Sequence, residues 1–268
     1  MIDKITQIEL RKKYNPEGSD LRKLQEHLLK ILEYFDSFCK DNNINYWLSS
    51  GTCLGAVRHG GFIPWDDDID VEMTREDYLK FQKIFKNNEN FVLQTYRNDL
   101  FYTEPFPKLR LCKTYVIEGE ISSLYRYNGI FLDIFIMERS NALIANLCHG
   151  LVGALRHFGF CFRQSRFMPI VVFAAAKKLV FGIVNFMRVL DFLSKKDEMR
   201  HTIGTGAVRN VRRISDIYPL GKALFEGKEY PVPGNVDAYL SRMFGNYMEI
   251  PKERHTHSFH DIKYFGSV

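Results

Sequence analysis

Five carboxylates crowd into eight consecutive residues of this 268-residue chain, and no other feature constrains the fold as strongly. They are Asp66, Asp67, Asp68, Asp70 and Glu72. From Asp68 to Met73 polar and apolar residues alternate, which is the period of a half-buried β-strand. We therefore predict that Asp68 and Asp70 share one face of a strand, while Ile69 and Val71 point into a core.

Carboxylates held side by side in a partly dry setting repel one another. The repulsion is relieved when one carboxylate takes a raised pKa, or when a divalent cation binds between them. Mg²⁺ prefers oxygen ligands and is often shared between one or two carboxylates and a substrate phosphate. The Asp68–Asp70 pair therefore predicts a metal–phosphate site. A bare Asp-x-Asp is also typical of a solvated acidic turn, so the preceding residues matter.

The residues before the acidic run suggest a place for that phosphate. Tyr46–Leu48 reads as a short strand, Ser49–Thr52 as a turn and Thr52–Arg58 as a helix. Backbone N–H groups at a helix start are unpaired, and the helix dipole there favours an anion. Ser50, Gly51 and Thr52 are the predicted phosphate-binding residues. An ordinary strand-to-helix turn is the alternative.

The stretch from Gly51 to Asp70, GTCLGAVRHGGFIPWDDDID, resembles the signature of the LicD-family phosphotransferases, which include fukutin-like proteins. The resemblance implies an α+β fold, with a nucleotidyltransferase-like mixed β-sheet flanked by helices. That superfamily combines a glycine turn, an Asp-x-Asp pair and a third Asp on a later strand. Two departures are Ser50, where a second glycine is usual, and Cys53, where leucine is usual.

A third carboxylate lies in the apolar run from Gly129 to Glu138. Burying an unpaired Asp133 would be costly, so this side chain needs a partner or a ligand. A structural aspartate capped by backbone N–H groups is one explanation. The resemblance favours the other, in which Asp133 joins Asp68 and Asp70 as the third metal carboxylate, or acts as a general base.

Three basic residues are further candidates for binding the substrate. On a strand over 106–112, Lys108 and Arg110 share a face, which fits a solvated edge or a phosphate clamp. The resemblance favours the clamp, because the family carries a similar basic strand. Arg58 lies inside the matching motif, where it would pair with Asp66 or reach a phosphate.

The middle of the chain changes character. Residues 141–199 are predicted to form two or three apolar helices with basic rims, inserted into a catalytic domain made of 1–140 and 200–268. The longest uncharged stretch, Ser140–Leu155, has 16 residues, fewer than the roughly 20 that span a bilayer. The insertion is therefore read as a buried helical subdomain or as an interfacial helix on an anionic membrane.

The rest of the chain predicts ordinary elements and a cytoplasmic setting. Helices are expected at about 20–41, 75–87 and 235–244, and strands at 91–96 and 115–118, the latter continuing the sheet. The net charge of +5 suits nucleotide phosphates or an anionic membrane, and nothing indicates nucleic acid. Five scattered cysteines and an N-terminus without a signal-type apolar core indicate the cytoplasm. His255, His257 and His260 are expected in a solvated tail.

The predicted activity follows from the resemblance. It is Mg²⁺-dependent transfer, with Mn²⁺ as an alternative, of phosphocholine or a similar phospho-alcohol from CDP-choline or a related CDP-alcohol. The expected acceptor is a sugar hydroxyl of a bacterial surface glycan. A glycan that is linked to a lipid is one form that this acceptor could take. Aromatic faces would hold the quaternary ammonium, with Trp47, Trp65 and Tyr102 among the candidates. Rival readings are an Asp-x-Asp glycosyltransferase using a nucleotide sugar and a non-catalytic, cation-binding membrane adaptor.

Overall fold

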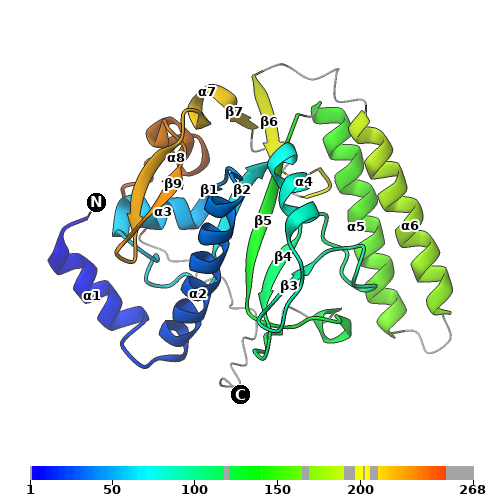
Figure 1. Cartoon of the computed structure of the whole chain (residues 1–268), viewed down its shortest axis with the longest axis horizontal. Coiled ribbons are helices and arrows are strands. Elements are labelled where there is room, and N and C mark those ends of the chain that lie inside the picture. Colours follow the sequence, from blue (N-terminus) through cyan, green and yellow to red (C-terminus); the bar gives the residue numbers. More distant parts are fainter. Residues whose placement is uncertain are drawn as a thin grey trace.

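A mixed β-sheet forms the centre of the fold in the computed structural model, which describes residues 2–117, 121–139, 141–164, 169–189, 197–201, 203–205 and 211–251 (Figure 1). Its strands are β1 (Trp47–Leu48), β2 (Asp70–Thr74), β5 (Phe131–Glu138), β4 (Lys108–Leu111) and β3 (Phe91–Gln94), in that order, with β6 (Glu198–His201) beside β5 and β7 (Val211–Arg213) beside β6. Strands β2 and β5 are parallel, and the other neighbours are antiparallel. A mixed sheet flanked by helices confirms the predicted α+β class.

Helices flank this sheet, and a hairpin lies beside it in Figure 1. The helices are α1 (Lys4–Tyr14), α2 (Asp20–Asp41), α3 (Ser50–His59), α4 (Arg75–Ile84), α5 (Ala142–Gln164), α6 (Ile170–Met187), α7 (Ile214–Ile217) and α8 (Val236–Phe244), with a short 3₁₀ turn at Ile121–Leu124. The hairpin consists of β8 (Gly221–Phe225) and β9 (Lys228–Val232).

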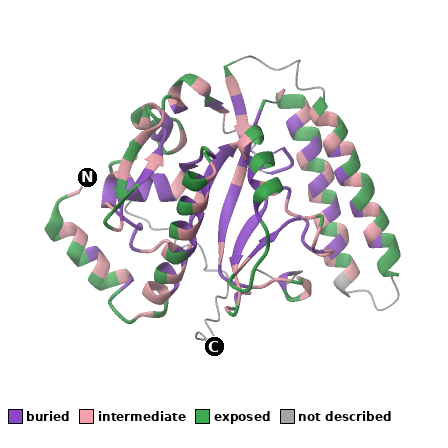
Figure 2. Cartoon of the chain, viewed as in Figure 1, coloured by how far each residue is buried: buried purple, intermediate pink, exposed green. Residues whose placement is uncertain are grey.

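Helix α2 shows why the predicted core forms. Its apolar residues recur at helical spacing, so one face is buried against the sheet while the other stays exposed (Figure 2). Leu28, Ile31 and Phe35 are each at most 1% exposed. Ser19 caps the helix start by accepting a hydrogen bond from the backbone N–H of Arg22. The helix predicted at 20–41 is thus confirmed.

Several local predictions need correction. Strand β2 begins at Asp70, so Asp68 lies in the loop before it and not in the strand. Ile69 and Val71 are fully buried as predicted, but Glu72 is fully buried too, because β2 is an inner strand covered on both faces. No strand forms at 115–117, where the N–H of Val116 instead donates to the carbonyl of Asn128. Residue 118 lies outside the described residues.

The stretch between β5 and β6 contains α5 and α6, which pack on each other at the right of Figure 1. Helix α6 is long and apolar enough to cross a membrane, by length and composition alone. Only 22% of its 18 residues are buried inside the protein. The sheet resumes at Glu198. The division into a catalytic domain and an insertion at 141–199 remains a prediction.

Candidate active site

Strand register brings three charged side chains together at the centre of the sheet. Asp70 on β2 is directly opposite Asp133 on β5, and Asp133 is opposite Lys108 on β4. Opposed residues on neighbouring strands place their side chains on the same face of a sheet. The ammonium Nζ of Lys108 lies 3.0 Å from Oδ1 of Asp133 and 3.3 Å from the ring centre of Phe131. The partner that the buried Asp133 requires thus comes from the adjacent strand β4.

The loop before β2 adds further carboxylates to this group. One oxygen each from Asp66, Asp67 and Asp68 lie within 4.8 Å of one another, and all three side chains are partly exposed. Burial and the charges of Asp68, Asp133 and Asp66 raise the pKa of Asp70 well above its usual value, opposed by Lys108. Burial, then Asp68 and Asp67, likewise raise the pKa of Asp66. Asp70 and Asp133 thus face each other across β2 and β5, and the charge of Asp68 acts on Asp70. That Asp68, Asp70 and Asp133 hold one ion together stays a prediction, because the close acidic group among the described residues is Asp66, Asp67 and Asp68.

This donor set fits a divalent cation. Clustered carboxylate oxygens are the ligands that Mg²⁺ prefers, and burial together with neighbouring carboxylates raises the pKa of Asp66 and of Asp70, as expected where carboxylates lie close together. Lys108 offsets only part of that charge. Asp66 was not among the predicted ligands, but its carboxylate lies with those of Asp67 and Asp68 in the loop before β2.

The predicted phosphate turn lies against the acidic loop. A Cβ added to Gly51 would come within 3.0 Å of Oδ2 of Asp66, so only glycine fits there without a shift. The hydroxyl of Thr52 accepts a hydrogen bond of 2.9 Å from the N–H of Asp70, which ties the start of α3 to the start of β2. The helix start therefore faces a carboxylate, and an anionic ligand reaches it only if the acidic charge is neutralised.

Ser50 has a left-handed backbone, with φ of +47°. Non-glycine residues adopt this conformation at a cost of roughly 1–2 kcal/mol. The strain makes Ser50 a poor residue for this turn unless its side chain has a use. Its hydroxyl lies 3.1 Å from that of Ser49.

We expect Ser50→Gly to stabilise the protein by about 0.5–1 kcal/mol, because glycine adopts positive φ without strain. Urea unfolding followed by circular dichroism measures the change. Ser49→Gly is the matched control: Ser49 has an extended backbone with φ of −117°, so the same substitution there should destabilise the protein. A lower unfolding midpoint for Ser50→Gly would contradict the interpretation of strain.

Two predicted substrate-binding arginines have structural partners. The guanidinium of Arg58 donates to the carbonyls of Tyr247 and Glu249, at 2.7 and 3.1 Å. Burial lowers the pKa of Arg58, opposed by the charge of Asp66. Arg110 shares a strand face with Lys108 as predicted, but it is 1% exposed and donates to the side chain of Gln94 and the carbonyl of Gly129. Through these contacts both arginines hold separate segments of the chain together.

The three aromatic candidates for the ligand head group differ in their exposure. Trp47 and Tyr102 are fully buried, which corrects the expectation that either could contact a ligand head group. Trp65, next to Asp66, stays partly exposed, with its ring 5.3 Å from that of Tyr14.

A buried network around Glu72 was not predicted. Its carboxylate accepts hydrogen bonds from Trp47 Nε1 at 2.7 Å, the Tyr239 hydroxyl at 3.0 Å and Arg212 Nη2 at 3.0 Å. The Tyr239 oxygen also lies 3.2 Å from Ser49 Oγ. The network therefore connects the C-terminal helix α8 with the turn that begins α3.

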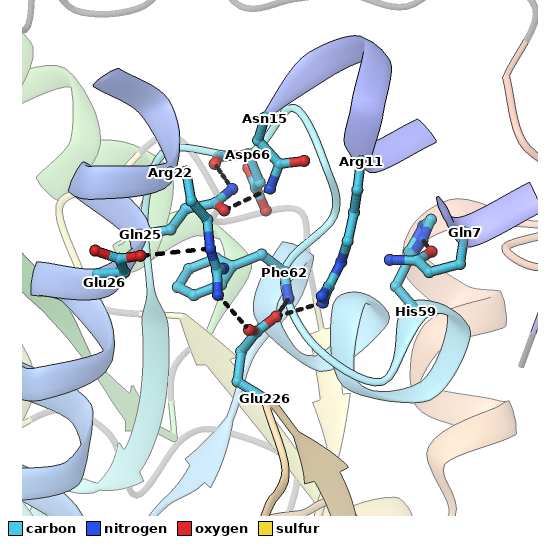
Figure 3. A network of polar contacts seen from close by, with 10 residues as sticks. All are labelled: Gln7, Arg11, Asn15, Arg22, Gln25, Glu26, His59, Phe62, Asp66 and Glu226. Atoms are coloured by element: carbon cyan, nitrogen blue, oxygen red, sulfur yellow. Dashed lines mark hydrogen bonds and ion pairs between the residues drawn. The ribbon is translucent and has the colours of Figure 1, made fainter. Parts of the chain in front are cut away.

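A second network supports the acidic loop from outside, as Figure 3 shows. Gln25 on α2 donates to the backbone carbonyl of Asp66 at 2.9 Å, and Asn15 holds the Gln25 amide oxygen at 2.7 Å. Glu226, in the β8–β9 turn, pairs with Arg11 and Arg22 and accepts the N–H of Phe62. Arg11, Asn15, Arg22 and Gln25 belong to no motif, so these contacts could not be predicted from the sequence. His255, His257 and His260 lie outside the described residues.

The mixed sheet, the opposed carboxylates and the helix start beside them define a nucleotidyltransferase-like α+β protein. The sequence profile of the family described as LicD/FKTN/FKRP, nucleotidyltransferase domain, matches residues 43–180, just over half of the chain. The chain therefore belongs to this family. The match extends past the signature residues at 51–70 and past Asp133, across α5 into α6.

Three relatives illustrate the range of the family. The chain is 26% identical to "Lipopolysaccharide cholinephosphotransferase LicD" of Haemophilus influenzae over 87% of its own length and 93% of that protein. It is 41% identical to "Uncharacterized protein RP689" of Rickettsia prowazekii over 48% of the chain and 44% of the relative. It is 53% identical to human "Ribitol 5-phosphate transferase FKRP" over 34 residues, which are 13% of the chain and 7% of that protein.

Proposed function

We propose that this protein transfers phosphocholine, or a similar phospho-alcohol, from a CDP-linked donor such as CDP-choline to a sugar hydroxyl. The acceptor would be a bacterial cell-surface glycan such as lipopolysaccharide, capsule or teichoic acid. Family membership and the near full-length similarity to a lipopolysaccharide cholinephosphotransferase support the reaction class. The observation that carries the proposal is the register that brings Asp70, Asp133 and Lys108 together beside the acidic loop.

The chemistry is a displacement at phosphorus. The sugar hydroxyl oxygen forms a bond to the phosphorus that carries the alcohol, the bond from that phosphorus to the bridging oxygen breaks, and CMP leaves with the bridging oxygen. Such reactions depend mainly on positioning and on stabilising charge. A divalent cation, Mg²⁺ or alternatively Mn²⁺, held by Asp68, Asp70 and Asp133, would neutralise charge on the donor diphosphate.

The chain's own residues supply the remaining functions. Lys108 holds Asp133 in place through their ion pair. In the alternative in which Asp133 is not a metal ligand, it would accept the hydroxyl proton as general base. Ser50, Gly51 and Thr52 at the start of α3 would bind donor phosphate oxygens once the acidic charge is neutralised. Trp65 is the partly exposed aromatic nearest in sequence to the acidic loop, and its face suits a quaternary ammonium.

The donor distinguishes this function from its rivals. Purified protein with Mg²⁺ and phosphocholine-free lipopolysaccharide should release CMP from CDP-choline or CDP-ribitol, and neither UDP from UDP-glucose nor GDP from GDP-mannose. EDTA should stop the release, and added Mg²⁺ should restore it. Release of UDP or GDP would identify a glycosyltransferase. Calorimetric binding of CDP-choline without turnover on any donor or acceptor would favour the adaptor.

A further inference from the structure

Helix α6 exposes an apolar surface far from the acidic cluster in sequence. Ile170, Val171, Val172, Leu179, Phe186 and, just after the helix, Val189 are each 48–71% exposed. Several of these recur at spacings that place them on one side of the helix, and Phe173, Lys177, Phe181 and Val184 are buried on the opposite side. An apolar stripe of this length on a soluble monomer normally meets a partner.

The buried side of α6 fixes how the helix lies. Phe181 stacks on Tyr96 with ring centres 3.8 Å apart, and Phe173 stacks on Phe101 at 5.5 Å. Lys177 donates to the backbone carbonyls of Asp99 and Leu100, at 2.6 and 2.7 Å. One side of the helix is therefore tied along its length to the segment after β3. A helix held in this way offers only its outer side to a bilayer, so it would lie along the surface and not span it.

A basic cavity of about 530 Å³ opens along the edge of the apolar stripe. Arg97, Lys177 and Lys178 line it together with the amides of Asn98 and Asn185, and its lining includes no acidic residue. The cavity is organised around the Tyr96 hydroxyl, which lies 3.2 Å from Arg97 Nε and 3.3 Å from Asn185 Nδ2. Burial lowers the pKa of Lys177 to about 8, opposed by Asp99, so its ammonium is still charged at neutral pH.

We propose that the outer side of α6 and the adjoining basic cavity form a docking surface for an anionic phospholipid bilayer. The apolar side chains enter the boundary between head groups and acyl chains, and Arg97 and Lys178 bind lipid phosphates, while Lys177 stays bonded to the carbonyls of Asp99 and Leu100. Charge complementarity selects this occupant, because cations beside an apolar stripe match the chemistry of an anionic leaflet. A second copy of the chain would face the same cations with its own.

The helical period places the basic cavity next to the apolar stripe of α6. Lys178 directly precedes Leu179 and lies one turn from Ala174 and Gly182, which also line the cavity. Residues at these spacings form a row between the buried side and the apolar stripe. A lipid phosphate in the cavity would therefore sit at the edge of the surface that the apolar side chains bury.

Vesicle sedimentation tests the docking surface without any nucleotide donor. The full chain should sediment with vesicles of phosphatidylcholine containing phosphatidylglycerol and remain in solution with phosphatidylcholine alone. Salt at about 1 M, where the Debye length falls to about 3 Å, should release it. Lys178→Glu and Leu179→Asp should each weaken the partition at least about tenfold, the first by removing attraction and the second by removing buried apolar area.

Matched changes elsewhere keep the test specific. Lys86→Glu and Leu224→Asp place the same substitutions at exposed positions outside the docking surface, and both should bind vesicles like the unmodified chain. Equal loss in these controls, or equal sedimentation with both vesicle types, would overturn the proposal. So would a dimer in solution that Leu179→Asp dissociates, because it would assign the stripe to a second copy. CMP release from soluble donors should be unchanged in Lys178→Glu, so failure here and failure of the proposed function are distinguishable.

Discussion

Asp70→Asn is expected to reduce CMP release at least about 10³-fold while the protein remains folded. Asp70 is the carboxylate at which the acidic loop and the opposed pair with Asp133 meet, so its loss removes charge from the centre of the site. Losing one well-placed electrostatic group typically costs 10²–10³ in turnover, and about 10³ or more where charge stabilisation dominates phosphoryl transfer. The measurement is the initial rate of CMP release at saturating donor.

The same variant should not lose stability. Burial and the neighbouring carboxylates raise the pKa of Asp70, which means that the folded protein disfavours its charge. Neutral asparagine removes that repulsion, so the melting temperature without added metal should stay the same or rise by a few degrees, about 2–4 °C per kcal/mol for a chain of this size. Mg²⁺ should raise the melting temperature of the unmodified protein and not of Asp70→Asn.

Asp41→Asn is the control for both readouts. Asp41 ends α2, is exposed and lies outside the cluster, so the substitution removes one carboxylate without touching the site. It should preserve turnover and the Mg²⁺-dependent stabilisation. If Asp70→Asn retained near-normal turnover, the acidic cluster would not be the catalytic centre, whatever cation it binds.

The acidic cluster could be predicted because short-range sequence patterns indicate it. Alternation places Asp70 on a strand beside buried neighbours, and a lone Asp133 in an apolar run requires a partner. Their opposition across β2 and β5 could not be derived, because parallel pairing depends on long-range register. Lys108 as the partner of Asp133 was missed for the same reason. Its strand face was predicted correctly, but nothing local indicates which strand lies beside it.

What the sequence could not reveal is a set of contacts between distant segments. Glu72 meets residues of β6, β7 and α8, all more than a hundred positions later. Glu72 had no predicted role beyond its place in the acidic run, and the structure encloses it in a separate buried network. Helix α1 was missed because it lacks an apolar stripe, with Leu10 its one buried residue among those that the structure describes.

Arg212→Met is expected to destabilise the protein by about 3–5 kcal/mol. Glu72 is fully buried, and burial by itself raises its pKa, but the charges of Arg212 and His201 and the hydrogen bonds of Trp47 and Ser49 outweigh that effect and lower it. Burial lowers the pKa of His201 to about 4, so this histidine is neutral near pH 7. Among the described residues, Arg212 is thus the charged partner of Glu72, and removing it leaves a buried charge uncompensated.

Urea unfolding measures this loss, and two further variants locate its cause. Arg213→Met makes the same change at the neighbouring exposed position and should shift the midpoint little. In Glu72→Gln combined with Arg212→Met both charges are absent, so a substantial part of the lost stability should return. Equal losses at both arginines, or no recovery in the double variant, would contradict the buried pair.

Because Tyr239 connects Glu72 to Ser49, Arg212→Met should also lower donor affinity in whatever fraction stays folded. The start of α3 would then depend on a carboxylate that never touches the substrate.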